Sequence, residues 1–159
     1  MNSVTFIFYA MPSFTQEHYY EFSVKQIYDI VVAVQHYPEF LPWCKEAEII
    51  SNSDGILIAK LRIEFKGISQ EYTSEVRYQY ENNHAKIDVK AIDGPFNHLV
   101  NLWEIEDYDG VTKVKFHVDF EFKLSLLDKL IKAVFSIAYE KMLAAFERRA
   151  DELYIIEKE

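Results

Sequence analysis

The chain has 159 residues and a formal net charge of −9, from 17 basic and 26 acidic residues. Broad binding to a phosphate backbone needs clustered Lys and Arg, so this balance argues against a nucleic-acid-binding protein, and we expect no DNA partner. The length suits one domain. Half of the residues are hydrophobic and 16% are aromatic. Such rings can fill a core, which composition alone favours, or line a hollow for an apolar ligand.

The first ten residues, MNSVTFIFYA, are mildly apolar and include no basic residue. They are too short to span a bilayer and do not resemble a signal peptide. Met11 is an alternative start, because the patterned part begins after it. We predict an extension over 1–11, one domain over 12–154 and a tail over 155–159. The single cysteine, Cys44, cannot form an internal disulfide, which favours a cytoplasmic location; peripheral contact at the inner face of a membrane is compatible with it.

Two kinds of element are predicted before residue 45. Residues 13–22 alternate loosely and indicate a strand. Ser23 is then a helix N-cap, and apolar residues recur at helical spacing until Pro38, which we expect to end the helix. Residues 39–42, between two prolines, predict a second short helical turn.

From residue 47 to 117 the pattern changes to period two, which is typical of strands. Turn signals divide this stretch at 52–55, Gly67, 82–83, 93–95 and 109–110. The last strand alternates most clearly and continues to residue 122, with one apolar face (Val114, Phe116, Val118, Phe120 and Phe122). The strand before it places Leu99, Trp103 and Ile105 together, with Asn101 as one polar interruption. Strands with one solvent-exposed face and one buried face indicate an antiparallel sheet that is covered on one side.

The end of the chain predicts a helix of about 25 residues, close to 40 Å long. Ser125 is the expected N-cap, with Asp128 placed as in a capping box. Its apolar stripe is Leu127, Leu130, Ile131, Val134, Ala138, Met142, Ala145, Phe146 and Leu153. The element order predicts an α+β, helix-grip fold, in which a curved antiparallel sheet surrounds a long C-terminal helix. A curled sheet and a straight helix leave a gap, which is either an open cavity or filled by aromatic rings.

Several motifs, taken in this order and spacing, resemble the coenzyme Q-binding START-domain family, which is grouped with polyketide cyclase/dehydrase-like sequences and includes proteins called ribosome association toxins. The similarity covers roughly residues 12–154. The motifs are Tyr37-Pro38-Glu39-Phe40-Leu41-Pro42-Trp43-Cys44, Glu71-Tyr72-Thr73-Ser74, Asp93-Gly94-Pro95-Phe96, Leu99 to Trp103, Val118-Asp119-Phe120-Glu121-Phe122 and Ala145-Phe146-Glu147-Arg148-Arg149.

This resemblance implies a START/Bet v 1-like fold with a hydrophobic tunnel for ubiquinone (coenzyme Q) or a similar polyprenyl lipid. The protein would then act as a carrier or chaperone that supports respiratory electron transport, and not as an enzyme. One position departs from the family. Relatives often have Phe-Lys before the Leu-x-Asn-x-Trp strand, and here Phe96 is followed by Asn97 and His98, so a basic side chain is missing near the expected mouth.

The expected ligand contacts come from the inward positions and from the segment between the two prolines. Asn101 could hydrogen-bond a quinone carbonyl or a neighbouring group. Trp43 is either part of a mobile lid over residues 38–43 or a core anchor, and the loop at Gly94-Pro95 is a second candidate entrance. The predicted ligand-binding residues are Leu41, Trp43, Tyr72, Phe96, Leu99, Asn101, Trp103, Phe116, Phe120, Val134 and Met142.

Other chemistries have weaker signals. No histidine pair has metal-ligand spacing, so we expect no metal, and no catalytic cofactor is expected beyond a bound quinone. Cys44 has no predicted base partner and reads as an inert buried thiol. Two alternatives to a quinone carrier remain: a ribosome-associated protein that blocks subunit association, and a cyclase-type enzyme with an acid or base inside the cavity.

Overall fold

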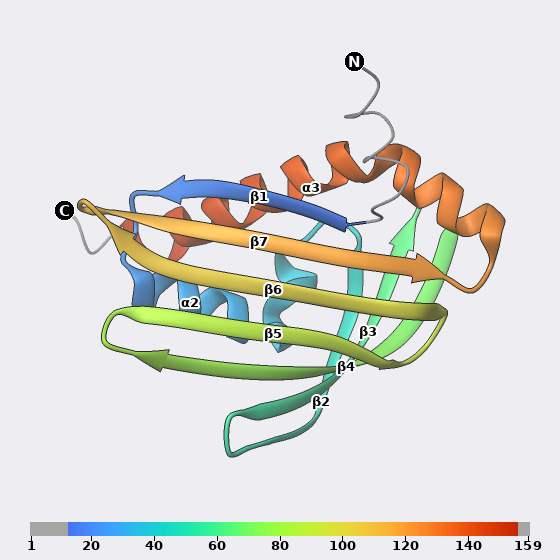
Figure 1. Ribbon diagram of the computed structural model, residues 1–159, viewed down its shortest axis with the longest axis horizontal. Helices are drawn as coiled ribbons and strands as arrows, with labels where there is room; N and C mark the ends of the chain where they lie inside the picture. The colour runs from blue at the N-terminus through green and yellow to red at the C-terminus, as the bar shows by residue number, and fades with distance from the viewer. Residues whose placement is uncertain (1–12, 156–159) are drawn as a thin grey trace.

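The computed structural model describes residues 13–155, which form seven strands and three helical segments (Figure 1). The predicted extension over 1–11 and all but the first residue of the predicted tail lie outside these residues, and the predicted domain limits stay predictions. The elements in chain order are β1 (Ser13–Tyr20), α2 (Val24–Val32), η1 (Val34–Glu39), β2 (Cys44–Ser53), β3 (Ile56–Phe65), β4 (Ile68–Glu81), β5 (His84–Asp93), β6 (Phe96–Tyr108), β7 (Val111–Phe122) and α3 (Ser125–Tyr154).

The seven strands form one antiparallel sheet in the order β1-β7-β6-β5-β4-β3-β2. Four of the hairpins turn on two residues with positive φ: 54–55, 66–67, 82–83 and 109–110. Positive φ at both positions is the type I′ geometry, which matches the twist of the flanking strands and favours Asn, Asp and Gly. These are the turns that the sequence predicts, and all four are confirmed.

Helix α3 runs along one face of the curved sheet, and α2 and η1 close one end of the same side (Figure 1). The predicted α+β, helix-grip arrangement is therefore confirmed. The inward side chains of β7 include the five predicted from its alternation, each at most 9% exposed, and also Thr112. No helix among residues 13–155 is long and apolar enough to cross a membrane.

Three boundaries near the N-terminus differ from expectation. Strand β1 ends at Tyr20 and not at residue 22, and α2 ends at Val32 and not at Pro38. The short second helix is the 3₁₀ segment η1, so the predicted turn over 39–42 is wrong. Ala33, with φ −81° and ψ 59°, breaks the helix between the β-branched pair Val31-Val32 and Val34. The predicted cap is confirmed, because Ser23 forms a full capping box with Gln26.

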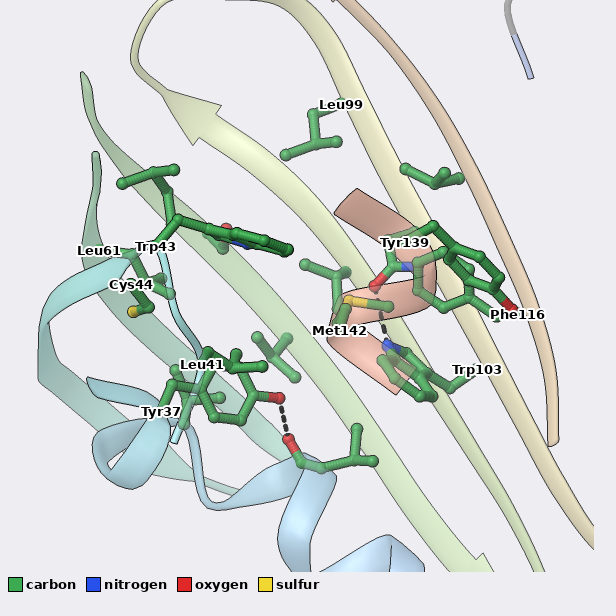
Figure 2. Close-up of a pocket in the computed structure, with 18 of the residues that line it drawn as sticks. Tyr37, Leu41, Trp43, Cys44, Leu61, Leu99, Trp103, Phe116, Tyr139 and Met142 are labelled. Carbon is green, nitrogen blue, oxygen red and sulfur yellow. Dashed lines mark hydrogen bonds between the residues drawn. The ribbon is translucent and has the colours of Figure 1, made fainter. Parts of the chain in front are cut away.

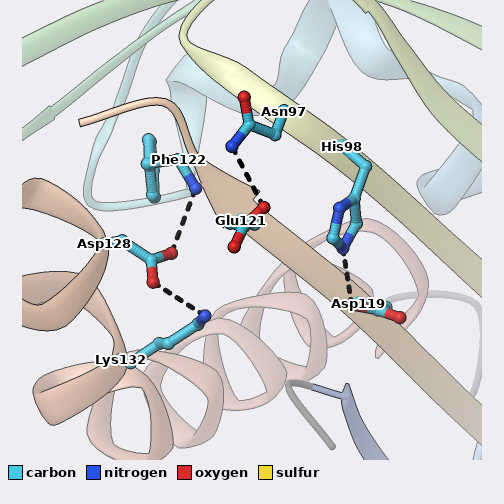
Figure 3. Close-up of polar contacts among 7 residues, drawn as sticks. All are labelled: Asn97, His98, Asp119, Glu121, Phe122, Asp128 and Lys132. Carbon is cyan, nitrogen blue, oxygen red and sulfur yellow. Dashed lines mark hydrogen bonds and ion pairs between the residues drawn. The ribbon is translucent and has the colours of Figure 1, made fainter. Parts of the chain in front are cut away.

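The start of α3 also differs from expectation (Figure 3). Leu124 occupies the N-cap position, and Ser125 is the first helical residue, so Ser125 is not the cap. The Asp128 carboxylate reaches backwards and accepts a hydrogen bond from the Phe122 amide at 3.0 Å. It also accepts from Lys132 Nζ at 2.8 Å. Asp128 therefore ties the first turn of α3 to the end of β7 and does not cap its own helix.

The apolar stripe of α3 is partly as predicted. Leu127, Ala145 and Phe146 are buried against the sheet, but Leu130 and Leu153 are exposed. The stripe also includes four residues that the sequence analysis omitted: Phe135, Tyr139, Leu143 and Ala150. The helix has 30 residues, slightly longer than predicted.

Candidate functional site

An apolar cavity of about 230 Å³ lies between α3 and the sheet (Figure 2). Side chains from α2, η1, α3 and strands β2 to β7 line it. Each inward position on a strand points at the helix because side chains alternate between the two faces of a sheet. Eight of the predicted ligand-binding residues meet at this cavity: Leu41, Trp43, Tyr72, Leu99, Asn101, Trp103, Phe116 and Met142.

A second apolar cavity, of about 220 Å³, adjoins the first. The two have six lining residues in common: Trp43, Ile63, Tyr72, Leu99, Val118 and Phe135. We call the first the inner cavity and the second the outer cavity. Phe96 and Phe120 line the outer cavity only. Val134 lines neither and is half-buried, because Phe135 and Ile131 present the cavity-facing side of α3.

Aromatic rings form much of the inner wall. The Trp103 ring packs edge-on against Phe116 at 4.8 Å and against Phe146 at 5.3 Å between centroids. Phe116 also contacts Tyr139 at 5.3 Å. Figure 2 shows the Trp43 ring entering the cavity from the side opposite this cluster. The aromatic residues therefore contribute both the packed core and the wall of an open cavity.

Asn101 has partners on both ends of its side-chain amide. Its Nδ2 donates to the His117 carbonyl oxygen at 2.8 Å, and its Oδ1 accepts from Trp103 Nε1 at 2.8 Å. The amide thus holds the Trp103 indole in place and satisfies a buried polar group. Of the two roles expected for Asn101, the bond to a neighbouring group is the one observed, while contact with a quinone carbonyl stays a prediction.

No Asp, Glu, His, Lys or Arg is among the described residues that line either cavity. The titratable groups there are tyrosines and Cys44. Burial raises the pKa of the Cys44 thiol to about 11 and that of Tyr139 to about 12. Burial also raises the pKa of Tyr37 and Tyr72. All of these groups are neutral at pH 7, so the cavity walls are uncharged. The Cys44 thiol is buried as expected, and its lack of reactivity stays a prediction.

The segment between Pro38 and Trp43 borders the inner cavity through Leu41 and Trp43. It is held to α3 from the outside by Arg149, whose guanidinium lies 3.5 Å from Glu39 Oε1 and 5.3 Å from the Phe40 ring centroid. Phe40 also packs against Phe146 at 5.2 Å. These contacts hold the segment over residues 38–43, one of the two candidate entrances, against α3, the helix that covers the cavity.

The second candidate entrance, the loop at Gly94, lies against Tyr72. A Cβ atom at Gly94 would stand 2.6 Å from the Tyr72 Cβ atom, and Gly94 has a φ of 137°. Only glycine permits this approach. The close contact places the β5–β6 turn directly behind a ring that lines both cavities.

The position where relatives often have a lysine lies on the solvent side of the sheet (Figure 3). Asn97 Nδ2 donates to Glu121 at 3.0 Å, and His98 Nε2 pairs with Asp119 at 2.8 Å. Neither side chain lines the two apolar cavities. Among residues 13–155 there is also no group of three His, Cys, Asp or Glu side chains that could hold a metal ion.

A curved antiparallel sheet closed over an apolar cavity by a long C-terminal helix defines a START-like, helix-grip domain. A family model described as polyketide cyclase/dehydrase and lipid transport matches residues 20–147. The chain belongs to this family.

Individual relatives and structures agree with this family. The chain is 40% identical over 144 residues to a ribosome association toxin of Rickettsia prowazekii, covering 90% of this chain and 99% of that protein. It is 32% identical over 138 residues to the mitochondrial coenzyme Q-binding protein homolog B of Xenopus laevis, covering 84% of this chain and 55% of that protein. A START superfamily structure from Mycobacterium smegmatis superimposes with a TM-score of 0.74 at 22% identity, covering 89% and 98% of the two chains; it supports the fold alone.

Proposed function

We propose that the protein binds ubiquinone, or an isoprenoid lipid of similar shape, beneath α3 and carries it without changing it covalently, in support of respiratory electron transport. The observation behind this proposal is the pair of adjoining cavities with uncharged, mostly apolar walls. Burial of an isoprenoid tail there is favourable by roughly 25 cal/mol per Å² of apolar surface, less the cost of ordering the tail. The relative named as a coenzyme Q-binding protein supports the choice of ligand.

A carrier of this kind must exchange its ligand with a bilayer, and the start of α3 has the surface for it. Leu124, Leu126 and Leu130 are 67%, 74% and 50% exposed. They flank Leu127, which lines the outer cavity. Lys123 and Lys129 lie among them and would be attracted to anionic headgroups. We therefore place transient membrane contact at this end of the molecule.

Extraction of the purified protein with organic solvent, followed by mass spectrometry, tests the proposal. We expect a quinone or another isoprenoid lipid in a stoichiometric amount, and uptake of added ubiquinone by protein stripped of lipid. Repeated extracts without any lipid, together with no binding of added quinone, would exclude the proposal.

Association with ribosomes is a second candidate function, which the 40% identity to a ribosome association toxin favours. The net charge of −9 speaks against a large RNA-binding surface. Sedimentation of ribosomes with added protein separates the candidates. A loss of joined ribosomes in favour of free subunits would support this function, and an unchanged profile would remove it.

A cyclase-type activity is the remaining alternative, which the description of the family model includes. Such chemistry needs an acid or base in the cavity. The candidates among the described lining residues are the tyrosines and Cys44, and burial raises the pKa of each of them. Recovery of a bound lipid unchanged after incubation would argue for carriage, and conversion to a new product would argue for catalysis.

A further inference from the structure

Ser74 is a polar residue at an otherwise apolar place in the inner cavity. It lies on the inward face of β4 between Tyr72 and Val76, and all three line this cavity. Its side chain is 2% exposed. The Ser74 Oγ atom has no hydrogen-bond partner among residues 13–155. A buried hydroxyl without a partner destabilises a protein, so its presence at a cavity wall calls for a partner in the cavity.

The surroundings of Ser74 leave room for such a partner. Its cross-strand neighbours are Ala59 on β3 and Ala91 on β5, which are among the smallest side chains. The amide of Asn101, which also lines this cavity, already has partners on both ends. The Cys44 Sγ atom is directed to the Glu46 carbonyl oxygen at 3.7 Å. The Asn101 amide and the Cys44 thiol are thus engaged with other groups, and the Ser74 hydroxyl is left to meet a ligand atom.

The Tyr139 hydroxyl, which is also buried and without a hydrogen-bond partner in the described part of the chain, has different surroundings. The Tyr139 ring is packed between Phe14 at 4.7 Å and Phe116 at 5.3 Å. Large rings thus crowd Tyr139, whereas small side chains flank Ser74. Ser74 is the better placed of the two to meet a ligand.

We infer that the Ser74 hydroxyl donates a hydrogen bond to an oxygen atom at the polar end of the bound lipid, which enters the cavity first. This inference rests on the proposed function and adds ligand orientation and class to it. Ser74 lines the inner cavity and not the outer one. The polar end then lies against β4, and the apolar tail runs through the outer cavity, past Phe96 and Leu127, towards the exposed leucines at the start of α3. The ligand class is an apolar lipid with a carbonyl, methoxy or hydroxyl oxygen on its inner end.

Two probes with the same decyl chain test this inference: decylubiquinone, whose ring has carbonyl and methoxy oxygens, and decylbenzene, which has no oxygen. Their affinities for the purified, lipid-stripped chain are measured by the change in tryptophan fluorescence on binding, since Trp43 and Trp103 both line the inner cavity. The variant is Ser74→Ala, which removes the hydroxyl and little volume. The control is Ser69→Ala on the exposed side of the same strand.

We expect Ser74→Ala to weaken decylubiquinone binding about three- to tenfold and to leave decylbenzene binding unchanged or stronger. Ser69→Ala should change neither. Equal effects of Ser74→Ala on the two probes, or no effect on either, would overturn the inference while leaving the proposed function intact; an internal water that satisfies Ser74 predicts this result. Failure of both probes to bind the unsubstituted protein would instead count against the proposed function. Thermal unfolding of Ser74→Ala without ligand verifies that the variant is folded.

Discussion

Single residues decide how much open space remains beneath α3. Ala138 lines the inner cavity from the helix side, one turn before Met142. A larger side chain at this position would occupy the volume that a ligand needs. The proposed function therefore requires a small side chain at this position.

Ala138→Phe is expected to reduce the affinity for decylubiquinone roughly tenfold or more, because the new ring fills part of the inner cavity. Fluorescence titration measures the affinity, and circular dichroism verifies the fold. Ala144→Phe is the matched control, since Ala144 is an exposed alanine on the same helix. Equal affinities of the two variants would show that the ligand does not occupy the inner cavity.

The predictable part of the site follows from side-chain periodicity. Leu99, Asn101 and Trp103 share a strand face with period two, so their convergence could be read from the sequence. Ser74 was missed as a cavity residue because Glu71 and Glu75 beside it suggest a solvated strand. The signal was present in the alternation of Tyr72, Ser74 and Val76. Val134 was predicted to line the site but does not, because the apolar stripe of a helix does not show which of its residues face a cavity and which lie at the edge of the stripe.

At the scale of elements, the contacts of Arg149 hold the segment between η1 and β2 against α3. This segment closes one side of the inner cavity with Leu41 and Trp43. Its backbone has hydrogen bonds from the Leu41 amide to the Tyr37 carbonyl oxygen and from the Cys44 amide to the Leu41 carbonyl oxygen. Hydrogen exchange of these two amides reports on opening of the segment.

Arg149→Ala should make these amides exchange several-fold faster, because both the ion pair with Glu39 and the contact with the Phe40 ring are lost. Exchange followed by NMR measures the change. Arg148→Ala, which alters an exposed neighbour, should leave both rates unchanged. Unaltered exchange in Arg149→Ala would mean that packing of Phe40 on Phe146 alone holds the segment closed.

The junction between β7 and α3 depends on one carboxylate. Partial burial by itself would raise the pKa of Asp128, but hydrogen bonds from Lys132 and from the Phe122 amide outweigh it and lower the pKa below its usual value. A carboxyl group with a lowered pKa in the folded state stabilises the fold above the unfolded-state pKa, near 3.8. That contribution is lost as the pH falls through the folded-state value.

Asp128→Asn is therefore expected to lower the free energy of unfolding by about 1 kcal/mol at pH 7, and the difference from the unsubstituted protein should disappear as the pH falls below about 4. Urea unfolding at a series of pH values measures it. Asp151→Asn, an exposed carboxylate on the same helix, is the control. A difference that stayed constant down to pH 2 would contradict a role for the charge.

The hairpins were predictable element by element, because Asn, Asp and Gly mark the positive-φ positions of type I′ turns. The break between α2 and η1 was not, since the apolar spacing from Val24 to Val34 continues across Ala33 as if the helix did. The cap of α3 was misassigned for a related reason. A Ser followed three residues later by Asp matches a capping box, and only the fold shows that Asp128 binds the preceding strand.

At the scale of the whole molecule, the exposed leucines, the outer cavity and the inner cavity follow one another from the start of α3 inwards. This order suits a lipid that passes between a bilayer and the protein. Exposed apolar side chains with basic neighbours favour the surface of an anionic membrane.

Leu126→Asp should weaken binding to vesicles of phosphatidylcholine and phosphatidylglycerol roughly tenfold. Burial of a leucine side chain is favourable by about 1.5–3 kcal/mol of free energy, and the substitution replaces this side chain with a charged one. Cosedimentation with the vesicles measures it. Ile137→Asp is the control: Ile137 is also exposed on α3, but it lies about 16 Å further along the helix. Equal losses in both variants would argue against a defined membrane-facing end.

The account depends most on where a quinone lies when it is bound. A crystal structure of the protein with decylubiquinone measures this directly. We expect the quinone ring in the inner cavity between α3 and β4, with the tail in the outer cavity. A quinone ring outside both cavities would contradict the account. So would a structure at saturating quinone concentration in which no ligand is bound and the Trp43 and Phe135 side chains fill the cavities.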